Sequence, residues 1–334
     1  MNKLDIRKFL EGDAPIIDVR SEGEFAEGHI PGAISLPLFN NAERAEIGTL
    51  YKQQGQQPAI LKGLEIVGPK MVHLSSSGLA LARNRKIAVH CWRGGMRSSS
   101  VAWLLESVGL EVTVLEGGYK AYRRLCLEVF AAPRRLVVIG GKTGARKTKI
   151  LAELKALGMS TVDLEALAAH RGSAFGYAAD GLQPTQEQFE NDLGAELIKS
   201  PADQPLLVED ESRLLGRLHI PDPLWHQIRS APVFVLEWPI ESRIEHLLEI
   251  YDAPEETIRA SLKAIHKRLG MERYKEALTA ISEGRRGDVC RIVLDYYDRA
   301  YSYGLSLRNP ATLSYLPGES AVREIRERLA CRSD

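Results

Sequence analysis

The fold of the first part of this chain is decided by the stretch His90-Cys91-Trp92-Arg93-Gly94-Gly95-Met96-Arg97-Ser98. It follows an apolar run at residues 87–89 and precedes an apolar-periodic segment at residues 99–108, a pattern typical of a strand, a tight loop and a helix. The loop places the Cys91 thiol at a helix N-terminus beside Arg93 and Arg97, where backbone N–H groups hold an anion and favour the thiolate. A buried structural cysteine is the alternative, but glycines and arginines at a strand–helix junction favour a catalytic nucleophile. The predicted anion loop comprises Trp92, Arg93, Gly94, Gly95, Met96, Arg97 and Ser98.

Short apolar runs alternate with helical segments on both sides of that loop. This alternation predicts an α/β fold with a parallel sheet. The expected strands are residues 13–20, 34–36, 87–89 and 112–115, and the expected helices are residues 22–27, 41–66, 98–108 and 120–130.

A second anion-binding loop lies further along the chain, in the stretch Gly140-Gly141-Lys142-Thr143-Gly144-Ala145-Arg146-Lys147-Thr148. A strand is expected before it at residues 136–139 and a helix after it at residues 148–157, and the stretch nearly matches the phosphate-binding pattern G-x-x-x-x-G-K-[ST]. Arg146 stands where that pattern has glycine, often a position with a conformation easy only for glycine. Either the loop is distorted or Arg146 adds a phosphate contact, so nucleotide hydrolysis is not assigned. The predicted diphosphate-binding residues are Gly141, Thr143, Gly144, Arg146, Lys147 and Thr148.

Acidic residues follow an apolar strand expected at residues 206–208. Glu209, Asp210 and Glu211 stand where a P-loop fold holds its metal ion. We therefore expect Mg²⁺ between Thr148 and Asp210, and regard Asp163, Glu209 and Asp210 as candidates for binding metal or substrate.

Basic residues gather locally, although the 44 Lys and Arg balance the 44 Asp and Glu. The absence of net charge excludes a global basic field, so a polyanion would need a local patch. Between Pro133 and Leu151 the chain has only basic charges: Arg134, Arg135, Lys142, Arg146, Lys147 and Lys149. The candidate contacts to RNA or phosphate are Arg134, Arg135, His170, Arg171 and Arg213; Arg213 and Arg217 could instead pair with Glu209 and Glu211.

The segment Ala131-Ala132-Pro133 breaks the alternating pattern. We place the domain boundary there, which gives a first domain at residues 1–130 and a second at residues 131–334. Residues 240–330 have helical periodicity and many charges, so a helical C-terminal region is expected. Its tyrosines at positions 296, 297, 301 and 303 could stack bases, but packing is favoured.

The cysteines at positions 91, 126, 290 and 331 have neither metal-ligand nor redox-motif spacing. The N-terminal residues lack the apolar core of a signal peptide, and no apolar run approaches membrane-spanning length. A cytoplasmic location, in which Cys91 stays a free thiol, is therefore expected.

Three strings before the first loop resemble the rhodanese family: Ile17-Asp18-Val19-Arg20-Ser21, Glu24-Phe25 and Gly28-His29-Ile30-Pro31-Gly32-Ala33. The resemblance covers roughly residues 5–125 and implies a rhodanese-like fold in which a cysteine carries sulfur as a persulfide. It also implies a structural role for His29. Five residues separate Cys91 from Arg97, whereas the usual rhodanese loop has four. The longer loop also resembles that of cysteine-dependent phosphatases and would admit a larger anion.

Further strings resemble the bacterial tRNA 2-selenouridine synthase family, a rhodanese domain fused to a P-loop domain, from about residue 10 to 250. They are Gly48-Thr49-Leu50-Tyr51-Lys52-Gln53, the stretch at residues 91–98, Gly117-Gly118-Tyr119-Lys120-Ala121-Tyr122-Arg123, Asp163-Leu164-Glu165, His170-Arg171-Gly172-Ser173 and Glu209-Asp210-Glu211-Ser212-Arg213.

This resemblance implies a transferase that acts on tRNAs for lysine, glutamate and glutamine carrying 2-thiouridine at the wobble position. Geranyl diphosphate would alkylate the sulfur, and selenium from selenophosphate would then replace the S-geranyl group. Cys91 would accept selenium as a perselenide or assist its attack, and an enzyme that supplies selenophosphate is a candidate partner. No tightly bound cofactor is expected; Mg²⁺ is a candidate ion, and selenophosphate and geranyl diphosphate are co-substrates.

Two other functions stay open from the residues alone. One is a cysteine-dependent phosphatase or sulfurtransferase with a fused nucleotide-binding regulatory domain, which would need a general acid near the thiol. The other is a non-catalytic module that binds RNA or a nucleotide.

Overall fold

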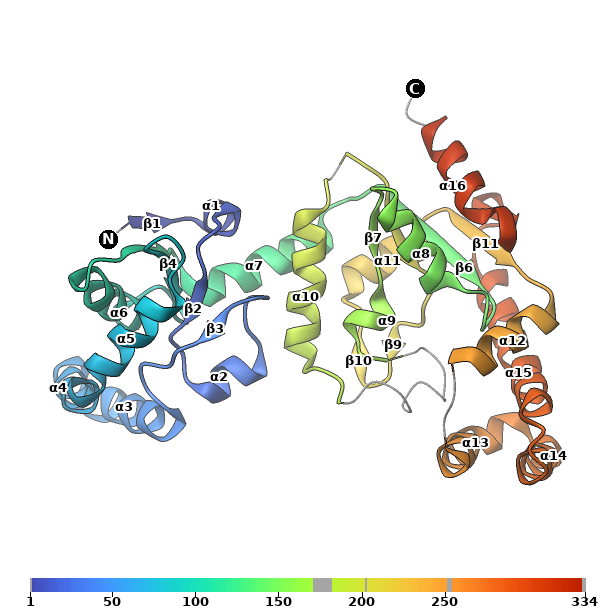
Figure 1. The fold of residues 1–334 in the computed structure, drawn as a ribbon, viewed down its shortest axis with the longest axis horizontal. Coiled ribbons are helices and arrows are strands. Elements are labelled where there is room, and N and C mark those ends of the chain that lie inside the picture. The colour runs from blue at the N-terminus through green and yellow to red at the C-terminus, as the bar shows by residue number, and fades with distance from the viewer. Residues whose placement is uncertain (1, 171–181, 202, 251–253, 332–334) are drawn as a thin grey trace. The chain divides into compact units, whose positions relative to one another are not determined.

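The computed structural model describes residues 2–170, 182–201, 203–250 and 254–331. The chain divides into two compact units (Figure 1). The first comprises residues 1–129 together with residues 190–195, and the second comprises residues 130–189 and 196–334. None of the helices in these described ranges is both long and apolar enough to cross a membrane.

The first unit contains a parallel sheet with the strand order β1-β5-β4-β2-β3. Ile87 and Val89 of β4 are fully buried and pack with Ile17, Val101 and Leu105 in one core. The strands are β1 (Asn2–Leu4), β2 (Ile16–Asp18), β3 (Ile34–Ser35), β4 (Lys86–His90) and β5 (Glu111–Leu115). The helices are α1 (Ile6–Glu11), α2 (Glu22–Glu27), α3 (Asn41–Gln54), α4 (Gln56–Val67), α5 (Met71–Leu81), α6 (Met96–Ser107) and α7 (Gly118–Ala131), with a 3-10 turn η1 (Gly68–Lys70).

The second unit contains a parallel sheet with the order β12-β11-β6-β8-β7 and a separate antiparallel pair, β9 with β10. Every residue of β6 is buried because the strand lies in the middle of the sheet. The strands are β6 (Leu136–Gly141), β7 (Ser160–Val162), β8 (Leu206–Glu209), β9 (Leu214–Leu215), β10 (Leu218–His219), β11 (Val233–Glu237) and β12 (Leu313–Pro317). The helices that follow or connect these strands along the chain are α8 (Lys147–Ala156), α9 (Leu164–Leu167), α10 (Gln186–Lys199), α11 (Asp222–Ser230) and α16 (Ala321–Ala330).

Most of the remaining C-terminal region is helical. It comprises α12 (Ile240–Ile250), α13 (Glu255–Leu269), α14 (Met271–Ser282) and α15 (Arg286–Ser306), followed by the short turns η3 (Pro310–Thr312) and η4 (Gly318–Ser320). Helices α13 to α15 share a core of their own, against which Tyr296 and Tyr297 pack as expected.

The α/β fold with parallel sheets is confirmed, and two edge strands were not predicted. Strand β1 is short and mostly exposed, so it carries no apolar alternation that would reveal it. Strand β12 lies within the region of helical periodicity, yet it pairs with β11 along five residues. Pairing with an existing strand thus overrides local periodicity at the edge of the second sheet.

Candidate functional site

The first candidate site is the loop between β4 and α6, which contains Cys91. The Cys91 side chain is nearly fully buried, and its Sγ lies 3.2 Å from the hydroxyl of Ser98. That hydroxyl also donates to the carbonyl of Gly95 at 3.1 Å. Ser98 therefore ties the sulfur to the first turn of α6.

The start of α7 holds the carbonyl groups of this loop. The N–H of Tyr119 donates to the Cys91 carbonyl at 2.8 Å, and the N–H of Lys120 donates to the Trp92 carbonyl at 3.0 Å. Gly118 makes this approach possible, because a Cβ there would lie 2.3 Å from the Cys91 carbonyl oxygen. In the described part of the chain, the N–H groups of residues 92–95 donate to no protein acceptor. The loop therefore keeps a set of donors for an anion in front of Cys91.

The two loop arginines have different surroundings. Arg97 forms a double hydrogen bond with Glu24, at 2.8 Å and 3.3 Å. Burial lowers the pKa of Arg97, but Glu24 and, to a smaller extent, Cys91 raise it overall. Arg93 instead lines a pocket of about 630 Å³ together with Lys120 and Arg124. The two arginines of the loop thus differ: Glu24 holds Arg97 in place, whereas Arg93 lines the pocket.

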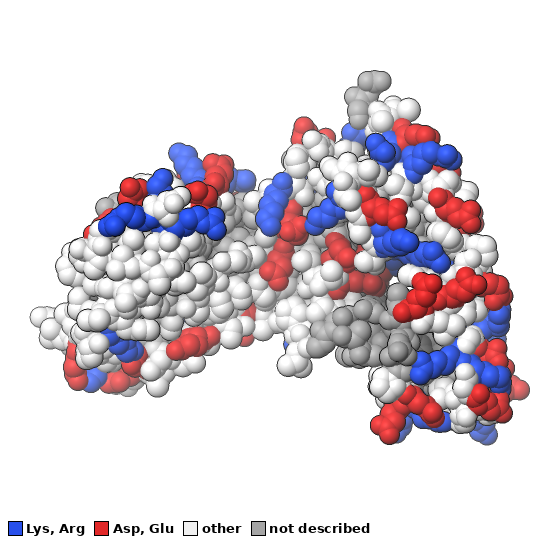
Figure 2. Space-filling model, in the orientation of Figure 1, with Lys and Arg blue, Asp and Glu red and all other residues white. Residues whose placement is uncertain are grey.

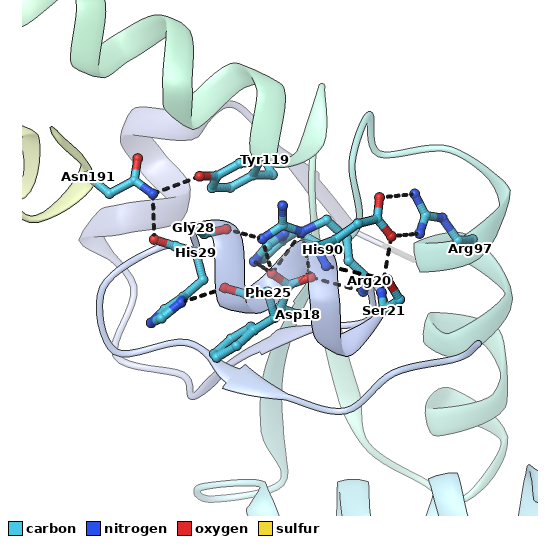
Figure 3. A network of polar contacts seen from close by, with 11 residues as sticks. Asp18, Arg20, Ser21, Phe25, Gly28, His29, His90, Arg97, Tyr119 and Asn191 are labelled. Atoms are coloured by element: carbon cyan, nitrogen blue, oxygen red, sulfur yellow. Dashed lines mark hydrogen bonds and ion pairs between the residues drawn. The ribbon is translucent and has the colours of Figure 1, made fainter. Parts of the chain in front are cut away.

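A buried polar network lies beneath the loop (Figure 3). Arg20 donates to Asp18 at 2.6 Å and to the Gly28 carbonyl at 2.7 Å, and its guanidinium lies 3.8 Å from the ring centroid of Tyr119. His90 Nε2 lies 3.7 Å from Asp18, and burial lowers the pKa of His90 to about 4. His90 is thus neutral at pH 7.

His29 has the structural role that was expected. Its ring stacks on Phe25 at 3.9 Å between centroids, and its Nδ1 lies 3.0 Å from the Phe25 carbonyl oxygen. Asn191, from the segment at residues 190–195, donates to the His29 carbonyl at 2.9 Å and contacts the Tyr119 hydroxyl at 2.7 Å (Figure 3). Nothing in the local sequence around Asn191 indicated this partnership, because the two segments are far apart along the chain.

The second candidate site is the loop between β6 and α8. Arg146 adopts the left-handed conformation, with φ 59° and ψ 30°, so its position does require the geometry for which glycine is suited. Its guanidinium lies 4.7 Å from the ring centroid of Trp238 and contacts the Ser242 carbonyl at 3.5 Å. The backbone at Arg146 thus adopts the conformation that the glycine of the pattern would adopt, and the arginine side chain packs on Trp238. The phosphate contact of Arg146 stays a prediction.

Lys147 and Thr148 lie against a group of carboxylates. Lys147 forms an ion pair of 2.8 Å with Glu211, and Thr148 Oγ1 donates to Glu209 Oε1 at 3.2 Å. Carboxylate oxygens of Glu165, Glu209 and Glu211 lie within 4.8 Å of one another. Burial disfavours the Lys147 ammonium, but these three carboxylates outweigh it and raise the pKa of Lys147. Lys147 is therefore a permanent cation at the loop.

Glu209 is fully buried, and its Oε2 has no hydrogen-bond partner within the described residues. Burial, and then the charges of Asp163, Glu165 and Glu211, raise the pKa of Glu209 well above its ordinary range. A second cation beside Lys147 would remove this repulsion. The donor set, three carboxylates and the Thr148 hydroxyl, is one that Mg²⁺ accepts.

The structure corrects the expected placement of Mg²⁺ between Thr148 and Asp210. Asp210 accepts from Arg308 at 2.6 Å and from the Tyr301 hydroxyl at 3.3 Å, and Glu209 takes its place beside Thr148. Successive side chains at the end of a strand point to opposite faces, so Glu209 and Glu211 share one side and Asp210 faces the other. Asp163 instead caps α9 by accepting the N–H of Ala166 at 2.8 Å.

Two residues far away in sequence complete the loop from the other side. The Tyr301 hydroxyl accepts the N–H of Gly141 at 2.7 Å, so this tyrosine is not only a packing residue. Arg243 donates to the Thr143 carbonyl at 3.1 Å and to Asp298 at 2.9 Å and 2.7 Å. Arg243 was not identified from the sequence, and Tyr301 was expected to pack, because both lie in helices whose local pattern indicates packing.

The predicted basic patch at residues 134–149 is not one surface. Arg134 precedes β6, where it donates to the Leu197 carbonyl at 2.6 Å, and Lys142 follows β6. Six strand residues of about 3.3 Å each place them about 20 Å apart, at opposite ends of the strand. Figure 2 likewise shows basic and acidic side chains interspersed on the face drawn.

The other predicted RNA contacts are also dispersed. Arg135 is exposed next to Arg134, and His170 is buried with a pKa that burial lowers. Arg213 pairs with Asp222, and Arg217 donates to the Gln183 carbonyl, so neither pairs with Glu209 or Glu211 as had been considered. Arg171 lies outside the described residues.

Comparison with known proteins identifies both units. The family model described as the tRNA 2-selenouridine synthase AAA domain matches residues 134–328, more than half of the chain. The chain belongs to the tRNA 2-selenouridine synthase family. A rhodanese-like domain model matches residues 4–125, so the fusion indicated by the sequence is confirmed. Membership makes the chain an enzyme that acts on tRNA in selenouridine synthesis.

Two solved structures match part of this tRNA 2-selenouridine synthase family member. The N-terminal domain of a putative ATP/GTP binding protein from Clostridium difficile 630 is 48% identical over 38% of this chain and 99% of that chain, with a TM-score of 0.35. A Saccharomyces cerevisiae homolog of single-domain rhodanese and Cdc25 phosphatase catalytic domain is 21% identical over 37% of this chain and 80% of that chain, with a TM-score of 0.22.

Proposed function

We propose that the chain converts 2-thiouridine at the wobble position of tRNA into 2-selenouridine through an S-geranyl intermediate. Geranyl diphosphate and selenophosphate are the co-substrates, and the tRNAs are those for lysine, glutamate and glutamine. The reaction takes place in the cytoplasm. The observation that carries the proposal is the presence, in one chain of this family, of two anion-binding loops with different reactive groups, Cys91 in one and Lys147 in the other.

The loop at residues 141–148 suits the geranyl transfer. The thiouridine sulfur attacks C1 of geranyl diphosphate, a carbon–sulfur bond forms, and the carbon–oxygen bond breaks to release diphosphate. In the described part of the chain, the N–H groups of residues 142–144 donate to no protein acceptor. Together with the Lys147 ammonium, they would stabilise the negative charge that develops on the diphosphate as it leaves. Stabilising that charge lowers the barrier without any nucleotide hydrolysis.

A Mg²⁺ ion fits beside this loop. Glu209, whose buried Oε2 has no partner among the described residues, and the Thr148 hydroxyl would hold it, with Glu165 and Glu211 as further oxygen ligands. When bound, the ion supplies positive charge to the diphosphate. The orientation of Thr148 and the charge of Lys147 are provided by the chain itself.

The loop at residues 91–98 suits the selenium transfer. Selenophosphate is an anion that the N–H groups of residues 92–95, which have no acceptor among the described residues, and the charge of Arg97 can hold next to Cys91. The selenium of selenophosphate then bonds to C2 of the uracil ring, the bond from C2 to sulfur breaks, and geranylthiolate leaves. Water cleaves the phosphorus–selenium bond, which releases phosphate and leaves 2-selenouridine. Alkylation prepares this step, because a thioether-like sulfur leaves the ring more easily than a thione. Cys91 assists the delivery of selenium in this proposal.

The proposal is tested by supplying purified protein with tRNA that carries 2-thiouridine, geranyl diphosphate and selenophosphate, then weighing the digested nucleosides by mass spectrometry. Omitting selenophosphate should stop the reaction at the S-geranyl nucleoside, and adding it should yield the selenium-containing nucleoside. Hydrolysis of a phosphoester by Cys91 with no dependence on RNA would instead establish a phosphatase. Unmodified nucleosides from a folded protein that binds tRNA would refute the reaction as proposed.

A further inference from the structure

The second unit contains a cavity of about 420 Å³ next to its anion-binding loop. It is bounded by the end of β11, by the C-terminal part of α15 and by the chain that leads into β12. Its volume lies in the lower part of the range of about 300–1,000 Å³ that is usual for small-molecule sites. Neither the binding of diphosphate nor the chemistry of Cys91 explains it.

The cavity is continuous with the loop. Lys142, Arg243 and Tyr301 line it. The Tyr301 hydroxyl accepts the N–H of Gly141, and Arg243 donates to the Thr143 carbonyl. A diphosphate in the loop would therefore have one wall of the cavity beside it.

Most of the interior of the cavity is apolar. Val235 forms part of its floor, Leu305 and Leu313 contribute branched side chains, and Trp238 and Tyr315 contribute aromatic rings. An apolar group that leaves water for this space is stabilised in proportion to the area it buries. The cavity is thus suited to a hydrocarbon.

Positive charges line the same cavity. Lys142, Arg243 and Arg308 are among its lining residues, and Asp298 and Asp210 pair with the two arginines at 2.7 Å and 2.6 Å. A ligand with both oxygen acceptors and an apolar chain matches this combination better than a plain hydrocarbon or a plain anion.

We propose that this cavity receives the hydrocarbon chain of the prenyl diphosphate whose phosphates bind the loop at residues 141–148. This inference rests on the proposed function and adds the site that selects the substrate. The chain lies along Leu305 and Leu313, with its diphosphate end toward Lys142 and Tyr301. The limited volume makes the cavity selective for a short prenyl chain.

Ser302→Trp tests the placement. Ser302 is exposed on α15 and lines the cavity, so an indole there takes up space without entering the core. Ala300→Trp is the matched control, because Ala300 is exposed on the same helix and does not line the cavity. We expect Ser302→Trp to raise the KM for geranyl diphosphate about tenfold and Ala300→Trp to leave it unchanged. Inhibition by inorganic diphosphate should stay the same in both variants.

An unchanged KM in Ser302→Trp would overturn the inference, as would an equal loss of affinity for inorganic diphosphate. A second variant, Tyr315→Ala, shortens an exposed side chain at the rim and should shift the preference from geranyl toward farnesyl diphosphate. Calorimetric titration with geranyl diphosphate separates the two proposals. If the protein binds geranyl diphosphate but transfers no geranyl group, and Ser302→Trp weakens that binding, the reaction is refuted and the cavity is supported. If Ser302→Trp leaves the binding of geranyl diphosphate unchanged, the cavity is refuted.

Discussion

The hydroxyl of Thr148 donates to Glu209 Oε1 at 3.2 Å, while the other oxygen of this fully buried carboxylate has no partner among the described residues. A carboxylate in this state repels Glu165 and Glu211 and favours a cation. Glu209 should therefore affect the charge of the site, its binding of metal and the stability of the second unit.

Glu209→Gln should separate activity from stability. We expect geranyl transfer to fall about 100-fold, because the positive charge opposite the leaving group is lost. The metal-free variant should be at least as stable as the wild type, because Gln never carries the negative charge that burial and the neighbouring carboxylates oppose. Asp210→Asn is the contrasting change: it leaves Arg308 buried without its ion pair and should destabilise the protein by about 3–5 kcal/mol. Urea unfolding measures the stability of each variant, and single-turnover geranyl transfer measures its activity. Equal destabilisation by Glu209→Gln and Asp210→Asn would contradict the different roles assigned to the two carboxylates.

The raised pKa of Glu209 predicts a pH dependence of stability in metal-free protein. The folded state holds a proton on Glu209 at a pH where the unfolded chain has lost it, so the free energy of unfolding should increase as pH falls from above the folded pKa toward 4.5. The wild type should show this increase relative to Glu209→Gln. If the difference in the free energy of unfolding between the two proteins does not change with pH, or changes in the opposite direction, Glu209 is not a buried, protonated carboxyl.

His90 should make the free energy of unfolding change with pH in the opposite direction. Its pKa falls from 6.5 to about 4 on folding, so the unfolded chain binds the extra proton between these values and stability is lost as pH falls through this window. The first unit should lose about 2 kcal/mol between pH 7 and pH 5 that a His90→Gln variant does not lose. Hydrogen exchange of the β4 amides reports this locally, and equal losses in both proteins would show that His90 is not buried neutral.

Cys91 and Cys126 provide a matched pair of buried thiols. Burial raises the pKa of Cys126 to about 11, so this thiol has no reactive form near neutral pH. Cys91→Ala should abolish the formation of 2-selenouridine and leave the S-geranyl nucleoside unaffected, whereas Cys126→Ala should change neither. Mass spectrometry of the digested tRNA distinguishes these outcomes. Selenation at the wild-type rate by Cys91→Ala would remove the cysteine from the reaction.

Arg146 should not disable the phosphate loop. A residue other than glycine in the left-handed conformation costs about 1–2 kcal/mol, which the contact of Arg146 with Trp238 offsets by about 0.5–1 kcal/mol. We expect Arg146→Gly to keep geranyl transfer within about threefold and to change the free energy of unfolding by about 1 kcal/mol or less. Loss of transfer in this variant would instead assign the guanidinium to the substrate. Lys147→Ala is the positive control and should lose most of the transfer.

Sequence patterns predicted the parts of the fold that depend on local order. Apolar runs at β4, β6 and β8 and the glycines that follow two of them indicated the parallel sheets and both loops, because strand burial and turn geometry are encoded within a few residues. The left-handed backbone at Arg146 could be inferred for the same reason.

The side-chain partners were harder to infer. Asp210 was expected at the metal, but the alternation of side chains along β8 turns it toward Arg308, which lies 98 residues away in sequence. Tyr301 and Arg243 reach the loop from helices whose spacing indicates only packing. Such contacts depend on how distant elements pack, and a single sequence contains no local signal for them.

Asn191 has a consequence for how this polypeptide is synthesised. It contacts the hydroxyl groups of Tyr119 and Tyr122, and close by Gly194 leaves room for the Cys126 side chain. The first unit therefore cannot complete its native contacts when its first 129 residues leave the ribosome, because one of its segments has not yet been translated. A nascent chain released or cleaved near residue 131 would expose the faces of α7 that this segment covers.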